Sequence, residues 1–187
     1  FGYLLLAKND FRNALKEFKH FTDIGRKVNK EQESDAWMRI GDCHFMQRQY
    51  RDAINAYSNA SKLSSKNADY SLYQQAMGYG AQGNLKSKIN SLNILTDNYK
   101  NSSFYDKALY ETGMAHLSDN DQRAAITSFN RLFKERPRSV LARQALIKIG
   151  EQAGYKTEIL EAVESVNKKQ KQVIVNKVIT ELEISLF

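Results

Sequence analysis

The sequence contains one cysteine and one proline in 187 residues, and it has no long apolar run. The single cysteine, Cys43, excludes an internal disulfide and a cysteine-based metal site, but it leaves the cellular compartment open. The scarcity of proline and glycine favours helices over turn-rich β structure. No stretch approaches the roughly 20 apolar residues that a membrane-spanning helix needs. Aromatic and aliphatic residues are frequent enough for a packed core, so the composition predicts a folded helical chain.

The segment 37–65 predicts two helices joined by a short polar turn at 47–49. On both sides of this turn, apolar and small residues recur at spacings of three and four, which places them on one face of each helix. Gly41 on the first helix and Ala53 on the second lie twelve positions apart. Two antiparallel helices can cross closely where small residues meet. The segment is therefore expected to form a helical hairpin.

The same spacing recurs along the chain, each time with a large apolar residue four positions after the second member. Successive copies begin 39, 35, 37 and 34 residues apart. The paired positions are Gly2/Ala14, Gly41/Ala53, Ala76/Lys88, Gly113/Ala125 and Ile147/Ile159. Such a period predicts an all-α, right-handed α-solenoid of about five helical hairpins. Where Lys88, Ile147 and Ile159 replace the small residues, we expect a looser crossing or a changed crossing angle.

We expect one solenoid over 1–187, with repeats at about 1–25, 34–65, 67–99, 103–136 and 139–167. The connection 25–33 is polar, and Ser34 and Asp35 are expected to cap the helix that follows it. The segment 101–103 is expected to cap the helix after the third repeat. A trailing helix is predicted at about 170–186, although its β-branched residues leave a strand open. The opening residues have the pattern of the second half of a repeat helix, so the sequence has the character of an excerpt from a longer array.

The pattern W-x2-I-G-x2-H followed by Y-x2-A-x3-Y-x2-A resembles the tetratricopeptide repeat (TPR). Pro137 lies where that repeat often ends its second helix. Residues 68–139 are similar to TPR arrays of large Bacteroidetes proteins and, more distantly, to periplasmic TPR proteins of the Tol–Pal and outer-membrane-assembly systems. The resemblance covers about residues 1–166. It implies a bacterial protein-interaction scaffold that is periplasmic or associated with the cell envelope.

In TPR arrays, the first helix of each hairpin lines a concave groove that binds a segment of a partner protein. The resemblance assigns the following residues to this groove: Met38, Asp42, Phe45, Tyr70, Tyr73, Met77, Lys107, Tyr110, Met114, Leu117, Gln144 and Lys148. Tyrosine offers contact area with a hydroxyl, and methionine repacks easily, which suits a peptide-binding surface. The alternative is that these side chains pack between neighbouring first helices. Some TPR domains hold a C-terminal carboxylate with lysines and asparagines here, and tyrosine and methionine disfavour that ligand.

The sequence shows no constellation typical of catalysis. His44 and His116 occupy the same repeat position and are expected to pack in the core. Adjacent helical residues point about 100° apart, so Cys43 and His44 cannot form a nucleophile–base pair. Phosphate-binding loops, nucleophile elbows and zinc-protease motifs do not occur. We therefore expect no enzyme, no cofactor, and no catalytic or metal-binding residue.

Two alternatives to a protein-binding groove stay open, and the formal charge of +7 raises the first of them. A nucleic-acid-binding helical repeat would align basic residues along the groove, with aromatics between them. The basic residues are instead spread along the chain, with denser stretches at 131–143 and 168–177, and the predicted groove positions are mostly neutral. Nucleic acid is therefore disfavoured. A homo-oligomer, formed through the apolar stripe near the C-terminus or an open end of the array, is the second alternative.

Overall fold

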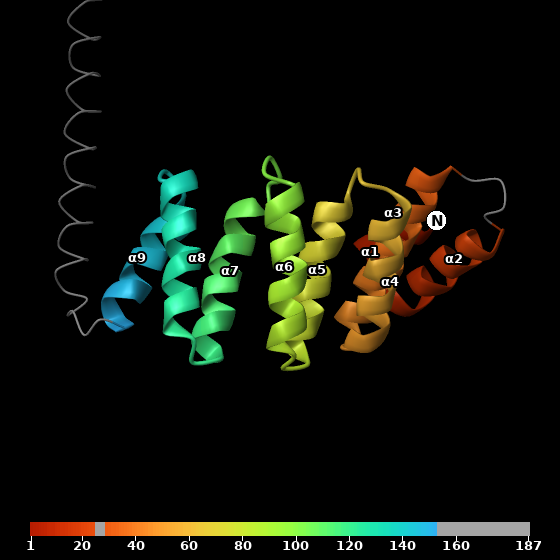
Figure 1. The fold of residues 1–187 in the computed structure, drawn as a ribbon. Helices are drawn as coiled ribbons and strands as arrows, with labels where there is room; N and C mark the ends of the chain where they lie inside the picture. Colours follow the sequence, from red (N-terminus) through yellow and green to blue (C-terminus); the bar gives the residue numbers. More distant parts are fainter. Residues whose placement is uncertain (25–28, 153–187) are drawn as a thin grey trace, which may run out of the picture.

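The computed structural model describes residues 1–24 and 29–152. Within them the chain forms nine α-helices and no strand. The helices are α1 (Gly2–Ala7), α2 (Phe11–Ile24), α3 (Lys30–Met46), α4 (Tyr50–Leu63), α5 (Ala68–Ala81), α6 (Leu85–Asn98), α7 (Tyr105–Ser118), α8 (Gln122–Glu135) and α9 (Val140–Gln152). Each helix packs against the next, and the hairpins stand side by side along one axis (Figure 1). The predicted all-α solenoid is confirmed for this part of the chain. The predicted helix at 170–186 and the second half of the fifth hairpin lie outside the described residues.

The four turns inside the hairpins share one backbone conformation. Asn9, Arg48, Gly83 and Asn120 have φ values of 58°, 60°, 73° and 60°. In each turn, the next amide N–H donates to the carbonyl five residues earlier at 2.9 Å. This is the Schellman motif, which ends a helix by satisfying its last carbonyls. Arg48 adopts the left-handed conformation at a steric cost that glycine avoids. The predicted turn at 47–49 is therefore confirmed.

Three glycines bring the two helices of a hairpin into contact through an aromatic ring sixteen residues later. A Cβ atom added to Gly41 would lie 2.5 Å from the Tyr57 ring, and one added to Gly113 would lie 2.3 Å from the Phe129 ring. Gly2 has the same relation to Phe18, at 2.9 Å. Carbon atoms in van der Waals contact are about 3.5–4.0 Å apart, so no side chain fits here. The ring on one helix thus packs directly on the backbone of the other.

The third hairpin departs from this pattern because Lys88 stands where the first, second and fourth hairpins have alanine. The aliphatic part of Lys88 runs beside Gly80, where an added Cβ would lie 3.2 Å from its Cδ. Its Nζ lies 2.6 Å from a carboxylate oxygen of Glu111 on α7. The lysine therefore leaves the interior of its own hairpin and links α6 to the next hairpin. The looser crossing that the sequence predicts here stays a prediction.

Two of the predicted capping sites need correction. The cap at Ser34 and Asp35 is wrong, because α3 already begins at Lys30 and the Asn29 side chain accepts from the Gln32 amide at 2.8 Å. Ser34 is buried inside the helix and donates to the Ala60 carbonyl at 2.8 Å, which ties α3 to the end of α4. At 101–103, the Ser102 hydroxyl accepts from an amide at 3.0 Å, but α7 begins only at Tyr105 and has no side-chain cap.

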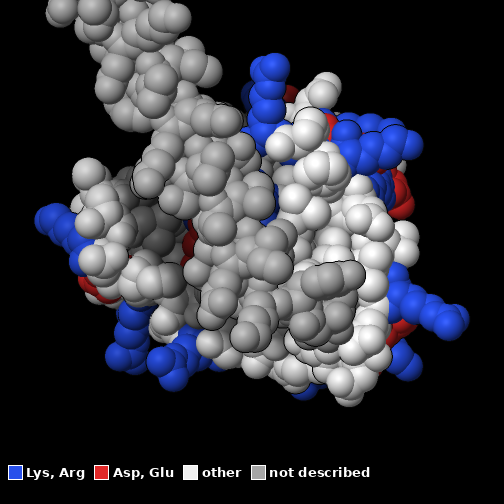
Figure 2. All heavy atoms as spheres, turned by 90° about the vertical axis from the view of Figure 1, so that its left-hand side faces the viewer, with Lys and Arg blue, Asp and Glu red and all other residues white. Residues whose placement is uncertain are grey.

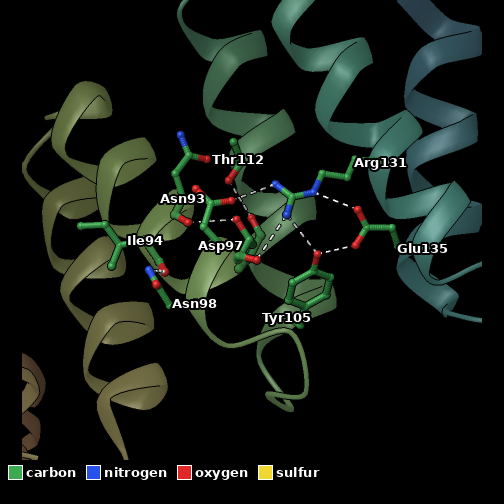
Figure 3. Close-up of polar contacts among 10 residues, drawn as sticks. Asn93, Ile94, Asp97, Asn98, Tyr105, Thr112, Arg131 and Glu135 are labelled. Atoms are coloured by element: carbon green, nitrogen blue, oxygen red, sulfur yellow. Dashed lines mark hydrogen bonds and ion pairs between the residues drawn. The ribbon is translucent and has the colours of Figure 1, made fainter. Parts of the chain in front are cut away.

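An arginine on α8 joins three helices of the third and fourth hairpins (Figure 3). Arg131 forms an ion pair with Glu135 at 3.1 Å on the same helix. The same guanidinium donates to the Thr96 carbonyl on α6 at 3.2 Å and to the Tyr105 hydroxyl on α7 at 3.1 Å. Tyr105, which is 0% exposed, donates its hydroxyl hydrogen to Glu135 at 2.5 Å. This network fixes the distance between neighbouring hairpins.

Gly113→Ala and Gly80→Ala test the ring-on-backbone contact. Alanine normally stabilises a helix interior relative to glycine by about 0.5–1 kcal/mol. At Gly113 the added methyl group collides with the Phe129 ring, so we expect a loss of about 1–3 kcal/mol. At Gly80 the nearest atom belongs to the flexible Lys88 chain, so we expect a gain of about 0.5 kcal/mol. Urea unfolding followed by circular dichroism measures both, and equal stabilities of the two variants would contradict the proposed contact.

Glu135 makes part of the stability depend on pH. The hydrogen bond from Tyr105, followed by that from Arg131, holds the pKa of Glu135 below its ordinary value. A carboxyl with a lowered folded-state pKa stabilises the fold above its unfolded pKa and loses that contribution as the pH falls. Glu135 is one-third exposed, so we expect Glu135→Gln to cost only about 0.5 kcal/mol at pH 7 and close to nothing at pH 3. Urea unfolding of the parent chain and the variant at pH 7 and pH 3 measures this cost. If the difference in unfolding free energy is the same at both pH values, the ionised Glu135 carboxylate does not contribute as described.

Candidate functional site

The twelve residues predicted for the groove all lie on the first helices of their hairpins. They are Met38, Asp42 and Phe45 on α3, Tyr70, Tyr73 and Met77 on α5, Lys107, Tyr110, Met114 and Leu117 on α7, and Gln144 and Lys148 on α9. Lys107 and Gln144 are exposed, and most of the others are half-buried. Met38 is only 2% exposed and therefore offers no contact area to a partner.

An aromatic cluster joins α5 to the start of α7. The Tyr73 ring stacks on Phe104, with ring centroids 5.1 Å apart, and the Tyr70 ring meets Phe104 edge-on at 5.7 Å. The Lys107 ammonium lies 5.6 Å from the centroid of the same Phe104 ring, within reach of a cation–π attraction. Phe104 thus holds three of the predicted residues together. Part of the surface of each of these three side chains is therefore covered by a contact within the chain.

Asp42 is the polar centre of the second and third hairpins. One of its carboxylate oxygens accepts from Tyr57 at 2.9 Å and from Tyr70 at 2.6 Å, and the other accepts from Arg39 at 2.9 Å. Burial, and next the charge of Asp42, raise the pKa of both phenols, so both hydroxyls are protonated and donate at neutral pH. Gln74 donates to the Tyr70 oxygen at 3.1 Å. Asp42 therefore joins α3, α4 and α5.

The remaining predicted residues divide between packing and exposure. Tyr110, Met114 and Leu117 pack against the buried cluster of the fourth hairpin, while Met77 packs against that of the third. Phe45 meets Tyr50 edge-on, with ring centroids 5.3 Å apart. The two interpretations of these positions are thus not exclusive, since half-buried side chains both support the core and present a surface.

Sequence reasoning did not identify Phe104 and Arg39, which hold the predicted groove residues in place. Arg39 pairs with Asp42 at 2.9 Å and with Asp35 at 3.3 Å on its own helix. Their spacings of three and four are a recognisable helical pattern of opposite charges, so this pair of contacts could have been found. Phe104 precedes its helix in a connecting segment, where no periodicity assigns a face. Its role follows only from the way consecutive hairpins stack.

Residues with reactive side chains are used for packing. Burial raises the pKa of the Cys43 thiol to about 11, which keeps it protonated and a poor nucleophile at neutral pH. His44 is 7% exposed, and its Nδ1 lies 2.6 Å from the Gln49 side-chain oxygen. Among the described residues, no group of three or more His, Cys, Asp or Glu side chains is arranged to hold a metal ion. None of the described helices is long and apolar enough to cross a bilayer.

The helical hairpins match a known family at two places. The family model "Tetratricopeptide repeat" matches residues 35–63 and residues 107–139, which correspond to the α3–α4 and α7–α8 hairpins. The chain carries tetratricopeptide repeats. Each matched stretch contains one of the glycine–aromatic contacts. Gly41 and Tyr57 lie in the first stretch, and Gly113 and Phe129 lie in the second.

Three solved structures with this TPR fold align with 66% to 91% of the chain. MamA shares 18% identity, covers 91% of this chain and 97% of its own, and superposes with a TM-score of 0.71. A tetratricopeptide repeat protein from Parabacteroides merdae shares 19% identity over 82% of this chain, with a TM-score of 0.69; the match spans 57% of that protein. The first TPR domain of Spaghetti (RPAP3), solved with the HSP90 peptide SRMEEVD, shares 19% identity, covers 66% of this chain and 95% of its own, and has a TM-score of 0.56. No curated protein matches the chain.

Tyr70→Phe tests whether Asp42 holds the TPR hairpins together. The variant removes one of two phenol donors to a half-buried carboxylate, so we expect a loss of about 1 kcal/mol of unfolding free energy. Tyr79→Phe on the same helix is the matched control, because its hydroxyl makes no hydrogen bond within the described part of the chain; we expect almost no change. Urea unfolding measures both variants. Equal stabilities would mean that the Tyr70–Asp42 bond contributes nothing.

Proposed function

We propose that this chain is a non-catalytic scaffold that binds a segment of another protein on the face of its first helices. We call this surface the first-helix face and define it by Tyr70, Tyr73, Met77, Lys107, Tyr110 and Met114. The TPR architecture supports a protein-binding role, and a TPR domain with the same fold has been solved with a bound peptide. The observation that carries the proposal is the partial exposure of aromatic and methionine side chains on consecutive first helices.

The fixed positions of these side chains favour binding. Tyr73 is stacked on Phe104 and Tyr70 is hydrogen-bonded to Asp42, so neither ring is free to rotate before a partner arrives. A surface that is ordered in advance loses less conformational entropy on association. Tyrosine in particular combines a large apolar ring with a hydroxyl, which is why it is frequent at protein interfaces. The half-buried packing role of these residues therefore supports the proposal.

The distribution of charge favours a neutral or basic partner segment over nucleic acid. Acidic residues outnumber basic ones on α3, α5 and α7, whereas basic residues outnumber acidic ones on α2, α4, α6 and α8. A view along the array from the α9 end shows Lys and Arg side chains projecting from several sides of the outline (Figure 2). Nucleic-acid binding depends on basic residues gathered along one path. The first-helix face lacks such a path within the described residues.

Site-specific photo-crosslinking tests the first-helix face. Benzoylphenylalanine is placed at Lys107 in the first-helix face, or at Gln144, a predicted groove residue on the next first helix, α9; both positions are exposed, and neither substitution alters the stacked tyrosines. We expect both positions, in the source cell, to crosslink the same protein through one continuous segment, because a groove ligand passes neighbouring first helices in turn.

The matched controls carry the crosslinker at Asn59 on α4 and Asn130 on α8, which are exposed on second helices. These positions should not crosslink that protein. Equal capture from both sets would move the binding surface away from the first helices. A captured nucleic acid in place of a protein would support the alternative function.

A further inference from the structure

A basic residue stands at the same place in each of the four complete hairpins that the structure describes. This place is the second residue of the second helix, directly after the hairpin turn. In α2, α4, α6 and α8 it is occupied by Arg12, Arg51, Lys86 and Arg123, and all four are exposed. Lysine and arginine make up 28 of the 187 residues, so their recurrence at all four positions is not expected from composition alone. The hairpins thus share a positive charge at one surface position.

Contacts within the chain do not account for these four charges. Within residues 1–24 and 29–152, none of the four side chains forms a hydrogen bond or an ion pair. Each lies in the first turn of its helix, where the helix dipole favours acidic side chains over basic ones. The preceding helix ends in a Schellman motif, whose amides bond its last carbonyls. Basic residues at these positions therefore add little to the stability of the hairpins.

The four hairpin turns lie on the same side of the array, which is the lower edge in Figure 1. We call the segments 8–12, 47–52, 82–87 and 119–124 the turn edge. It carries two more exposed cations, Lys8 and Arg48. Arg48 has a φ of 60°, a conformation that the other three turns give to asparagine or glycine, so this cation is present at a steric cost. The turn edge is therefore a row of exposed basic side chains along the array.

The carboxylates of the turn edge decide which part of it attracts anions. Asp10 and Asp121 accept from the backbone amides of Asn13 and Ala124, at 3.2 and 3.0 Å, and so cap α2 and α8. In the first three turns, five cations stand against two carboxylates, Asp10 and Asp52. The fourth turn has two carboxylates and one cation. The first three hairpins therefore supply the positive charge of this edge.

We propose that the turn edge of the first three hairpins binds the surface of a lipid bilayer that contains anionic lipids. Cations in a row along one side of the array reach a flat surface together, and each lysine or arginine near an anionic bilayer adds to the attraction. Anionic lipids diffuse laterally, so they can gather at each hairpin without a fixed spacing.

The residue types of the turn edge favour a bilayer over nucleic acid. Its two aromatic residues, Phe11 and Tyr50, are half-buried, so the edge lacks the exposed rings on which the bases of a single strand stack. The proposal does not depend on the first-helix face, because none of the residues of that face lies in the turn edge. A bilayer at the turn edge contacts the ends of the helices and leaves the first-helix face open to a protein segment.

Vesicle flotation with the 187-residue chain tests the turn edge. The probes are vesicles of phosphatidylcholine with about one-third phosphatidylglycerol, and vesicles of phosphatidylcholine alone. We expect binding to the anionic vesicles only, at about 0.1 M KCl, and release at about 1 M KCl, where salt screens the charges. The turn-edge variant, with Arg12→Gln, Arg51→Gln and Lys86→Gln, should need at least about tenfold more lipid for half-maximal binding, since it loses three of the five cations.

A matched control variant separates the turn edge from net charge. Lys19→Gln, Lys62→Gln and Lys134→Gln together remove three exposed charges from the second helices outside the turn edge, and this variant should bind as the parent chain does. Both variants keep the basic stretch 168–177, so any contribution from it is the same in the two. Circular dichroism verifies that both stay folded.

Two kinds of outcome overturn the proposal. In the first, the parent chain does not bind the anionic vesicles, or the turn-edge variant binds them as strongly as the control variant does. In the second, a labelled RNA of about 20 nucleotides binds the parent chain, is lost in the turn-edge variant and displaces the vesicles, which would assign the turn edge to nucleic acid.

Discussion

The contact between a glycine and an aromatic ring at the helix crossing is the constraint on which the array depends. With Gly41 under the Tyr57 ring and Gly113 under the Phe129 ring, the two helices of a hairpin approach until ring carbon meets backbone. Ala53 and Ala125, fully buried beside these rings, leave room for that approach. Because the ring is large and flat, it fixes both the separation and the rotation of the helices. The surfaces that each hairpin offers to its neighbours follow from this geometry.

The crossing residue also connects one hairpin to the next. Tyr57 places its ring on Gly41 and its hydroxyl on Asp42, and the same carboxylate accepts from Tyr70 of the following hairpin. In the third and fourth hairpins, leucine and phenylalanine stand at this position and have no hydroxyl, so other polar contacts link the hairpins. Arg131 and Tyr105 connect α6, α7 and α8 there, and Lys88 reaches Glu111. Apolar contacts thus build the hairpins, while buried polar groups set their register, since an unpaired polar group in these positions would be costly.

The sequence predicted the parts of the structure that repeat, and missed those that occur once. The helical hairpins, the turn at Arg48 and the burial of His44 follow from periodicity, because the same pattern recurs several times along the chain. The cap at Ser34 was wrong because serine serves equally well as a helix cap or as a buried donor to a neighbouring carbonyl, and only the position of α4 decides between them. The role of Phe104 was missed for the same reason, because its ring contacts depend on how two hairpins stack.

The candidate site shows the same division. The resemblance to the TPR assigned twelve residues to a groove, and all twelve lie on the first helices of their hairpins, but it did not reveal how much of each side chain the neighbouring hairpin covers. Met38 is buried, whereas Tyr73 at the equivalent position of the next hairpin is half-exposed and stacked on Phe104. Exposure depends on the size of the residues that the neighbouring hairpins contribute, and the repeat pattern does not fix these.

Exposure that breaks the repeat is therefore more informative than exposure alone. A half-buried tyrosine on the first-helix face has counterparts in other hairpins with similar surroundings, so its exposed part is a regular property of the array. Phe21 differs, because it is 39% exposed, whereas Ala60, Leu95 and Leu132 at the equivalent position are 0% exposed. The residue type does not account for this difference, because phenylalanine is as apolar as leucine, so the exposure of a repeat position depends on the neighbouring residues.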